Sequence, residues 1–235
     1  MSWRDIWQRK GQLAANPSGL SELIATDGFD GGCGKIATSE WVQMVTSATR
    51  RVSLRPDERI CEVGCGAGAF LYPLYQAGYR GICGFDYSPP HIAHCRRVMA
   101  LGLFVAAEAA SNPFRDSVFD IVFCNGVIHY FPTLEYADQT VREIVRTLRN
   151  NGRSLILDIN DAGKRSEYEA QRRARLAPGE YDRLYADAPH LFYERDWWHR
   201  NADRWGLSLE IYDQDVQGYG NSPFRYNVLL RKRGD

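Results

Sequence analysis

Short apolar runs alternate with amphipathic segments through the middle of the chain. The apolar runs have the length of β-strands and cover residues 59–63, 81–86, 103–108, 119–125 and 154–160. Helical periodicity is found between the runs at 69–79 and 88–100. A third amphipathic helix is indicated by an apolar stripe of Val141, Ile144, Val145 and Leu148. Strands that are apolar throughout are typical of parallel sheets covered on both faces. The pattern therefore predicts a doubly wound α/β fold.

The two flanks of this core have patterns of their own. At the N-terminus, Trp3, Ile6 and Trp7 share one face of a short helix that Gly11 is expected to end. A further helix is expected from Thr38. After residue 160 the sequence predicts a helix over 194–206 and two closing strands within 207–214 and 224–232. The last of these strands is expected to be antiparallel to the others.

Composition and charge exclude some classes of protein. Lys and Arg together number 29, as do Asp and Glu, so the net charge is zero. A neutral chain is not suited to coating nucleic acid or an anionic membrane. No run approaches ~18 apolar residues, and the N-terminus lacks an apolar signal core, so we expect a soluble, cytoplasmic protein. The sequence does not indicate an oligomeric state.

The six cysteines are expected to be reduced. Cys61, Cys83 and Cys124 fall inside apolar strands, where a thiol behaves as a small buried hydrophobe. Cys61 and Cys65 have no second Cys or His pair at zinc spacing. We therefore predict no metal site.

The glycine-rich stretch DGFDGGCGK, residues 27–35, does not fit a phosphate-binding P-loop. That motif requires glycine where the chain has Phe29, and Ser or Thr where it has Ile36. We interpret the stretch as a flexible surface loop.

A second glycine-rich stretch, ICEVGCGAGAF at residues 60–70, follows the first predicted core strand. Gly64, Gly66 and Ala69 satisfy the spacing of a dinucleotide-binding loop, which is a weak signal alone. Glu62 argues against a pyrophosphate, because like charges repel, and favours a ligand with an ammonium or sulfonium group. Asp86 ends the next strand, roughly twenty residues on, where a carboxylate accepts hydrogen bonds from ribose hydroxyls.

Polar residues fall at the ends of several predicted strands. They are Glu62, Asp86, Glu108, Asn125 and Asp158. Because ligands of open parallel sheets bind beyond the carboxyl ends of the strands, we expect a site at this edge.

Five motifs, in order, resemble those of the class I S-adenosylmethionine-dependent methyltransferases. They are EVGCGAG, GFDYS, AAEAASNPF, FDIVFCNGVIHYF and LRNNGRSLILD. In the last, Asn150 and Asn151 replace the usual Pro-Gly, which changes a turn but not the site. The resemblance covers about residues 55–160 and implies a Rossmann-like fold. We expect one methyltransferase domain over 1–235, with an N-terminal helical cap at 1–54, the cofactor-binding core at 55–160, and a substrate-side segment with closing strands at 161–235.

The resemblance implies which residues bind S-adenosylmethionine. Glu62 is expected to face the methionine end, Asp86 the ribose and Tyr87 the adenine. Glu108 and Ala109 are expected at the adenine edge. The remaining positions are the glycine loop and the end of the fourth strand: Gly64, Cys65, Gly66, Gly68, Asn125 and Gly126.

Residues on the acceptor side are less clearly marked. His129 follows the fourth strand and is the first candidate for a general base, with His190 the second. His91 and His94 are expected to be exposed on the second core helix. Several aromatic side chains are candidates to cover the pocket or to be core residues: Trp3, Trp7, Tyr130, Tyr193, Trp197 and Trp198. Arg225 is either a ligand for an acceptor carboxylate or phosphate, or a surface hairpin residue.

The acceptor predicted from the sequence is a small molecule methylated on oxygen or nitrogen. The NGVI after the fourth strand differs from the Asp/Asn-Pro-Pro-aromatic motif of amino-directed nucleic acid methyltransferases, so a nucleic acid partner is disfavoured. The basic stretch 164–175 is interpreted as a solvated helix face. Two alternatives stay open: an NAD(P)-dependent oxidoreductase, which Glu62 contradicts, and a non-catalytic S-adenosylmethionine-binding protein.

Overall fold

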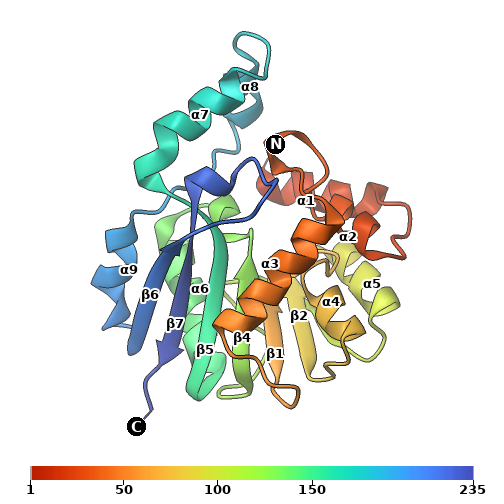
Figure 1. The fold of residues 1–235 in the computed structure, drawn as a ribbon, viewed down its shortest axis with the longest axis vertical. Helices are drawn as coiled ribbons and strands as arrows, with labels where there is room; N and C mark the ends of the chain where they lie inside the picture. The colour runs from red at the N-terminus through yellow and green to blue at the C-terminus, as the bar shows by residue number, and fades with distance from the viewer. Residues whose placement is uncertain (1, 235) are drawn as a thin grey trace.

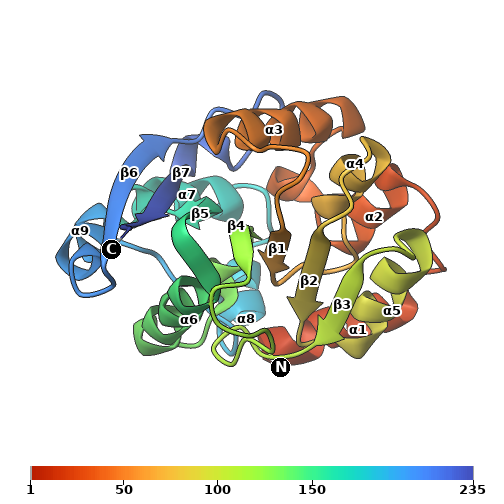
Figure 2. The same ribbon diagram turned by 90° about the horizontal axis from the view of Figure 1, so that it is seen from below.

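The computed structural model describes residues 2–234, in which a seven-stranded sheet forms the centre of the molecule (Figure 2). The strands are β1 (Ile60–Val63), β2 (Ile82–Asp86), β3 (Leu103–Ala106), β4 (Phe119–Asn125), β5 (Leu148–Asn160), β6 (Leu207–Asp213) and β7 (Arg225–Lys232). Their order is β3-β2-β1-β4-β5-β7-β6. The first five pair in parallel, and β7 pairs antiparallel with both β5 and β6. The predicted doubly wound fold is confirmed.

Helices cover both faces of the sheet. They are α1 (Trp3–Leu13), α2 (Leu20–Thr26), α3 (Thr38–Arg51), α4 (Leu71–Gln76), α5 (Pro89–Val98), α6 (Leu134–Thr147), α7 (Arg165–Arg173), α8 (Glu180–Tyr185) and α9 (Arg195–Ala202). The 3-10 turns are η1 (Gly32–Gly34), η2 (Ile128–Tyr130), η3 (Ala162–Lys164) and η4 (Ser222–Phe224). Figure 2 shows α3 and α4 on one face and α6 on the other. None of the helices within residues 2–234 has the length and apolar character needed to cross a membrane.

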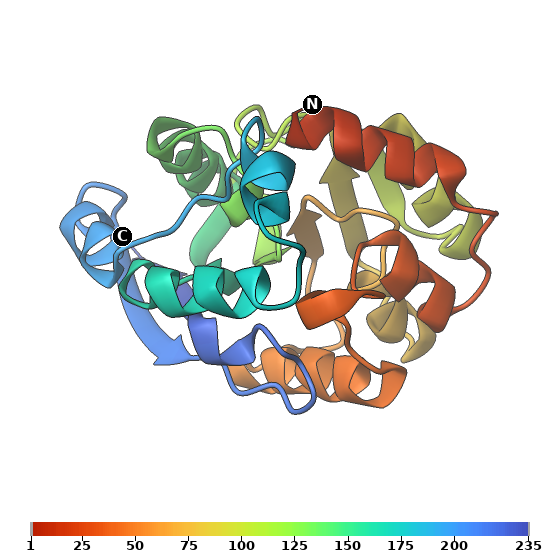
Figure 3. The ribbon, with the colours of Figure 1, turned by 90° about the horizontal axis from the view of Figure 1, so that it is seen from above.

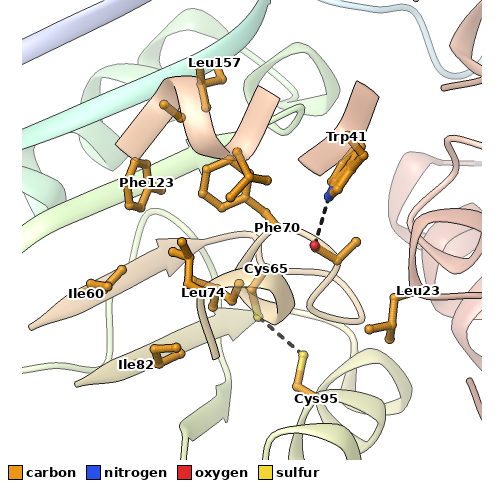
Figure 4. Close-up of a cluster of buried hydrophobic side chains, with 14 of the residues drawn as sticks. Leu23, Trp41, Ile60, Cys65, Phe70, Leu74, Ile82, Cys95, Phe123 and Leu157 are labelled. Atoms are coloured by element: carbon orange, nitrogen blue, oxygen red, sulfur yellow. Dashed lines mark hydrogen bonds between the residues drawn. The ribbon is translucent and has the colours of Figure 1, made fainter. Parts of the chain in front are cut away.

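Alternate side chains of the strands build two apolar cores, one on each face. Ile60 packs with α3 and α4, whereas its neighbour Cys61 packs with α6. In the first core the indole Nε1 of Trp41 donates a hydrogen bond of 2.9 Å to the carbonyl oxygen of Ala69 (Figure 4). This bond ties α3 to the loop that follows β1, so the first core fixes the backbone beside the end of that strand.

Helix α1 extends past its expected end and lies against α5. Gly11 is buried inside α1, where an added Cβ would lie 2.6 Å from Nδ1 of His91. His91 and His94 are therefore buried, contrary to the expected exposure. His94 Nε2 lies 3.0 Å from the carbonyl oxygen of Gly11. The absence of a side chain at residue 11 is what allows the two helices to approach.

Four helices lie on the side of the molecule where the parallel strands end. Figures 1 and 3 show α1, α2, α7 and α8 around this edge of the sheet. They come from the two flanks of the chain, residues 3–26 and 165–185. The segments before and after the sheet core thus supply the surroundings of any site at the strand ends.

Candidate functional site

A cavity of about 500 Å³ opens at the carboxyl ends of β1, β2 and β4. Its volume lies in the ~300–1,000 Å³ range of small-molecule and cofactor sites. Most of the residues predicted from the sequence line it: Trp3, Trp7, Glu62, Gly64, Cys65, Gly66, Asp86, Tyr87, Glu108, Ala109, Asn125, Gly126 and Tyr130. Five others do not line it: Gly68, His129, His190, Tyr193 and Arg225.

The loop after β1 requires glycine for two separate reasons. Gly64 and Gly66 have φ of +67° and +51°, a region that residues with a Cβ rarely adopt. An added Cβ at Gly64 would also lie 2.6 Å from a methyl group of Val127. An added Cβ at Gly66 would lie 2.3 Å from Oδ1 of Asp27. The loop therefore lets other parts of the chain approach its backbone closely.

Asp27 was not among the predicted site residues, and the expected flexible surface loop is wrong at this position. The residue follows α2, lines the cavity, and accepts hydrogen bonds from the backbone nitrogens of Ala67 at 2.6 Å and Ala69 at 3.0 Å. Phe29, in the same loop, packs edge-on against Trp41 at 4.7 Å between ring centres. The apolar residues of α2 before Asp27 indicate a buried helix but do not indicate its contact with the loop after β1.

Three carboxyl groups meet at one end of the cavity. Glu62 is 2% exposed, and its Oε2 has no hydrogen-bond partner. Burial, reinforced by Asp27 and Asp86, raises the pKa of Glu62 well above its ordinary value. Burial also raises the pKa of Asp27 to about 7 and raises the pKa of Asp86. Lys10, a cation near Asp27, pairs with Asp30 instead, at 3.2 Å. This end of the cavity is therefore suited to a ligand that carries positive charge.

Asp86 is held in one orientation by two backbone groups. Its Oδ2 accepts a hydrogen bond of 3.2 Å from Gly66 N, and its Oδ1 accepts one of 2.8 Å from Ser88 N. A carboxylate oxygen can accept more than one hydrogen bond. Acceptor capacity toward the cavity therefore remains, as a ribose would need.

The wall beyond Asp86 includes two side chains that α1 covers. Tyr87 donates its hydroxyl hydrogen to the carbonyl oxygen of Trp3 at 3.3 Å. Glu108 pairs with Arg4 and accepts a hydrogen bond of 3.0 Å from the hydroxyl of Tyr136. Helix α1 thus lies over the part of the cavity formed by β2 and β3.

Helix α1 also reaches the segment after α8. The indole Nε1 of Trp3 donates to the carbonyl oxygen of Pro189 at 3.0 Å, and its ring stacks on His190 at 4.7 Å. Trp7 contacts Tyr130 edge-on at 5.2 Å. The N-terminal helix and residues 187–191 together cover the cavity.

His129 and His190, far apart in sequence, are brought together behind Tyr130. Their ring centres are 5.5 Å apart, and neither Nδ1 has a hydrogen-bond partner. Burial lowers the pKa of both well below the ordinary value, and the nearby Arg172 and Arg225 lower it further. Both imidazoles are therefore neutral near pH 7, the form that accepts a proton.

Arg225 is a buried residue and not a surface hairpin residue. It is 3% exposed, and its Nε lies 3.4 Å from Oδ1 of Asp158. Asp158 has φ of +61° at a pairing irregularity of β5 between Ile156 and Ile159. Such bulges commonly redirect a side chain at a functional edge. Here the bulge leaves Asp158 beside the first residue of β7.

Three of the predicted aromatic residues belong to the core instead of the cavity wall. Tyr193 donates its hydroxyl hydrogen to the carbonyl oxygen of Ile128 at 2.7 Å and packs with Trp197 and Trp198. This position, on the α6 and α9 face of the sheet, corrects the expectation that Tyr193 contacts the acceptor.

A comparison with protein families matches residues 61–156 to the family described as "Methyltransferase domain". The chain is also similar to a sterol 4-C-methyltransferase of Caenorhabditis elegans, with 22% identity over 75% of the chain and 52% of that protein. A tRNA (carboxymethyluridine(34)-5-O)-methyltransferase of Xenopus tropicalis is 34% identical over 44% of the chain and 16% of that protein. A probable non-canonical nonribosomal peptide synthetase of Salinispora arenicola is 26% identical over 68% of the chain and 2% of that protein. The chain thus spans about half or less of each relative.

Solved structures share the fold. The putative methyltransferase in a complex with the Trm112 methyltransferase activator of Haloferax volcanii superposes with a TM-score of 0.70, at 13% identity, over 97% of this chain and 98% of that one. Magnesium protoporphyrin IX methyltransferase of Synechocystis PCC 6803, solved with bound SAH, superposes with a TM-score of 0.60, at 14% identity, over 96% of this chain and 99% of that one. At these identities the likeness concerns the fold alone.

Proposed function

Through residues 61–156 the chain belongs to the class I S-adenosylmethionine-dependent methyltransferases, and on that premise we propose that it methylates an oxygen or nitrogen of a small-molecule acceptor. The single observation that supports S-adenosylmethionine as the cofactor is the state of the Glu62 side chain. Its buried carboxyl has an unpartnered oxygen in a cavity that it shares with Asp27 and Asp86. A cationic ligand relieves the repulsion among these groups.

S-Adenosylmethionine is the cofactor of this family, and when bound it supplies a methyl group activated by a positively charged sulfur. We assign the ammonium and sulfonium end to the side of Glu62 and Asn125, whose Oδ1 is also buried and unpartnered. Asp86 is assigned to the ribose hydroxyls. The adenine is assigned to the wall formed by Tyr87, Glu108 and Ala109. The loop glycines allow the ligand to pass close to the backbone.

The contribution of the protein to the reaction is alignment and exclusion of water. Trp3, Trp7 and Tyr130 supply apolar surface over the cavity, and the Trp3–Pro189 hydrogen bond holds the N-terminal helix against the opposite segment. For an acceptor hydroxyl, a proton must also leave. We assign it to the neutral imidazole of His129 or His190, which lie side by side behind Tyr130.

The small-molecule assignment rests on the covering of the cavity. Residues from α1 and from 187–191 lie over it, so that the acceptor must fit beneath these segments. The relatives do not decide the acceptor, because their names include a sterol and a tRNA methyltransferase. Position 62 carries a carboxylate, which disfavours the pyrophosphate of NAD(P) and hence the oxidoreductase alternative.

The first experiment compares the melting temperature with S-adenosylhomocysteine, NAD and NADP. A ligand at about a hundred times its dissociation constant adds roughly 2.7 kcal/mol to the free energy of unfolding. We expect stabilisation by S-adenosylhomocysteine alone. Stabilisation by a nicotinamide cofactor alone would overturn the cofactor assignment.

The second experiment tests catalysis. Labelled S-adenosylmethionine is incubated with a panel of small hydroxyl and amine compounds, with transfer RNA and with a protein extract as competing acceptors. We expect label in a small molecule. Label only in RNA or protein would refute the acceptor assignment, and cofactor binding without transfer to any acceptor would favour the non-catalytic alternative.

A further inference from the structure

Arg225 has more hydrogen-bonding capacity than its surroundings use. Its side chain is buried, yet Nε and Nη1 have no hydrogen-bond partner. Asp158, its one ion-pair partner in the described chain, accepts hydrogen bonds from Gln214 at 3.0 Å and Tyr219 at 3.0 Å. Unpaired donors on a buried guanidinium are costly unless a ligand accepts from them.

A second arginine lies on the other side of the same small region. Arg172 of α7 has its guanidinium carbon 4.5 Å from the centre of the Tyr168 ring, and that of Arg225 is 5.4 Å from the same point. Arg172 donates from Nη1 to the hydroxyl of Tyr185 at 2.8 Å, but its Nε has no partner. The hydroxyl of Tyr168 is buried and also unpartnered. Three of the unused polar atoms here are therefore guanidinium nitrogens, which only donate hydrogen bonds.

The charges of this region do not balance. Both guanidinium groups lie near the Tyr168 ring, Asp158 pairs with Arg225, and within residues 2–234 Arg172 forms no ion pair. Nearby acidic side chains on α7 are committed elsewhere, since Glu169 pairs with Arg165 and Arg173. A water molecule would satisfy donors but would leave the excess positive charge. A group with several acceptor oxygens and a negative charge would satisfy both.

This region lies beside the covered cavity. Tyr130 lines the cavity, and its ring centre is 5.4 Å from that of His190. His190 in turn lies 6.2 Å from Tyr168 between ring centres. A small molecule bound with one end near the cofactor thus has its other end within a few side chains of the two arginines.

We propose that Arg172 and Arg225 together bind a carboxylate or phosphate group of the methyl acceptor. The identification of the bound molecule as the methyl acceptor rests on the proposed function. Anion binding itself is measurable without turnover. Arg225 supplies a buried guanidinium beside Asp158, and Arg172 brings its guanidinium from α7. The acceptor class is then an anionic small molecule, with the methylated atom at a distance from its anionic group.

The test uses the whole protein saturated with S-adenosylhomocysteine. Its melting temperature is followed while sodium benzoate, benzamide or sodium phosphate is added at constant ionic strength set with sodium chloride. Benzoate and benzamide share one ring and differ in charge, and phosphate represents the other anion. We expect a saturable rise with benzoate or with phosphate and none with benzamide. Benzoate alone would indicate an acceptor carboxylate, and phosphate alone a phosphorylated acceptor.

Two variants on adjacent positions make the comparison specific. Arg172→Gln removes a cation from the proposed subsite, and Arg173→Gln removes one from the exposed pairs with Glu169 and Asp182. We expect Arg172→Gln to weaken anion binding by roughly 10- to 100-fold, the range of a charge-assisted hydrogen bond, and Arg173→Gln to leave it unchanged. Arg225→Lys keeps the charge but loses the fork, and should weaken the anion similarly.

The binding of S-adenosylhomocysteine is measured in every variant. Unchanged binding shows that the variant is folded and that the cofactor half of the proposed function stands. Equal anion affinities in Arg172→Gln and Arg173→Gln would overturn the subsite, as would the same response to benzamide and benzoate. Failure of wild-type protein to bind S-adenosylhomocysteine would instead overturn the proposed function. The anion titration is then carried out on the protein without S-adenosylhomocysteine, and it still tests the anion subsite.

Discussion

Asp27 and Gly66 are in direct apposition: an added Cβ on the glycine would lie 2.3 Å from the carboxylate oxygen Oδ1. The two residues are 39 positions apart in the chain. The contact joins the loop after α2 to the loop after β1, and it ties the N-terminal segment to the glycine-rich wall of the cavity.

Gly66→Ala should cost more stability than the positive φ alone explains. An alanine in this backbone region costs about 1–2 kcal/mol, and at residue 66 it must also displace Asp27. The matched control is Gly78→Ala, because Gly78 has φ of +96° and nothing within 4 Å of an added Cβ. Urea unfolding and binding of S-adenosylhomocysteine measure both effects. Equal losses in the two variants would show that the contact with Asp27 has no energetic weight.

The stability of the ligand-free protein should fall as the pH rises through neutrality. Burial raises the pKa of Asp27 from 3.8 to about 7, so the folded state keeps a proton that the unfolded state has lost. The contribution of Asp27 to the free energy of unfolding is fully present below about pH 4 and is lost as the pH rises through about 7. Asp27→Asn should flatten this dependence, with part remaining from Glu62 and Asp86, whose pKa values are also raised. Urea unfolding at a series of pH values measures this dependence. If the free energy of unfolding of Asp27→Asn changed with pH as steeply as that of the wild-type protein, Asp27 would not be the group responsible.

Binding of S-adenosylhomocysteine at about pH 6 should release protons. The ligand ammonium favours the ionised form of the carboxyls whose pKa values are raised in the empty cavity. Calorimetry in two buffers of different ionisation enthalpy counts the protons released. Glu62→Gln should bind more weakly and release fewer. Net proton uptake by the wild-type protein would refute the placement of the ammonium beside these groups.

Asp86→Ala should weaken binding of S-adenosylhomocysteine by roughly 30- to 150-fold, equivalent to about 2–3 kcal/mol for hydrogen bonds to a charged acceptor. The control is Asp116→Ala, an exposed carboxylate that pairs with Arg146 away from the cavity. Wild-type affinity in Asp86→Ala would show that the ribose lies elsewhere.

Asp158→Asn should destabilise the protein by about 3–5 kcal/mol, because it leaves the guanidinium of Arg225 buried without a counter-charge. Asn tolerates the positive φ of this position, so the backbone is not the cause. Asp203→Asn breaks an exposed pair with Arg233 and should cost less than about 1 kcal/mol. The free energy of unfolding in urea measures both, and a small loss in Asp158→Asn would mean that Arg225 is already balanced.

The gathering of polar side chains at one edge of the sheet was predictable because these residues lie within one repeating pattern. Glu62, Asp86 and Asn125 end successive strands of the sheet, and the alternation of strands and helices determines that they share an edge. Asp27 was missed because its partners, Ala67 and Ala69, lie in another element, and no local pattern links the two.

The surroundings of Arg172 and His91 were less predictable because they depend on long-range packing. Arg172 belongs to a basic helix that was interpreted as a solvated face, yet its guanidinium turns toward Tyr168. His91 is buried because α1 covers α5, and this coverage depends on Gly11 of α1, which is distant in the sequence from α5. In each case the burial comes from an element whose position the sequence pattern does not encode.

The antiparallel direction of β7 has a consequence for how such a protein can diversify. The parallel strands meet the site with their ends, whereas β7 meets it with its beginning, so Arg225 and the turn before it face Asp158 of the neighbouring strand. The segments that surround the arginines, 161–191 and 214–225, thus lie outside the strands and loops that form the glycine-rich end. If the two arginines bind the acceptor as proposed, exchange of these two segments would alter the molecule that is accepted while the glycine-rich end keeps its sequence, and the chain would then be a modular scaffold for recombination.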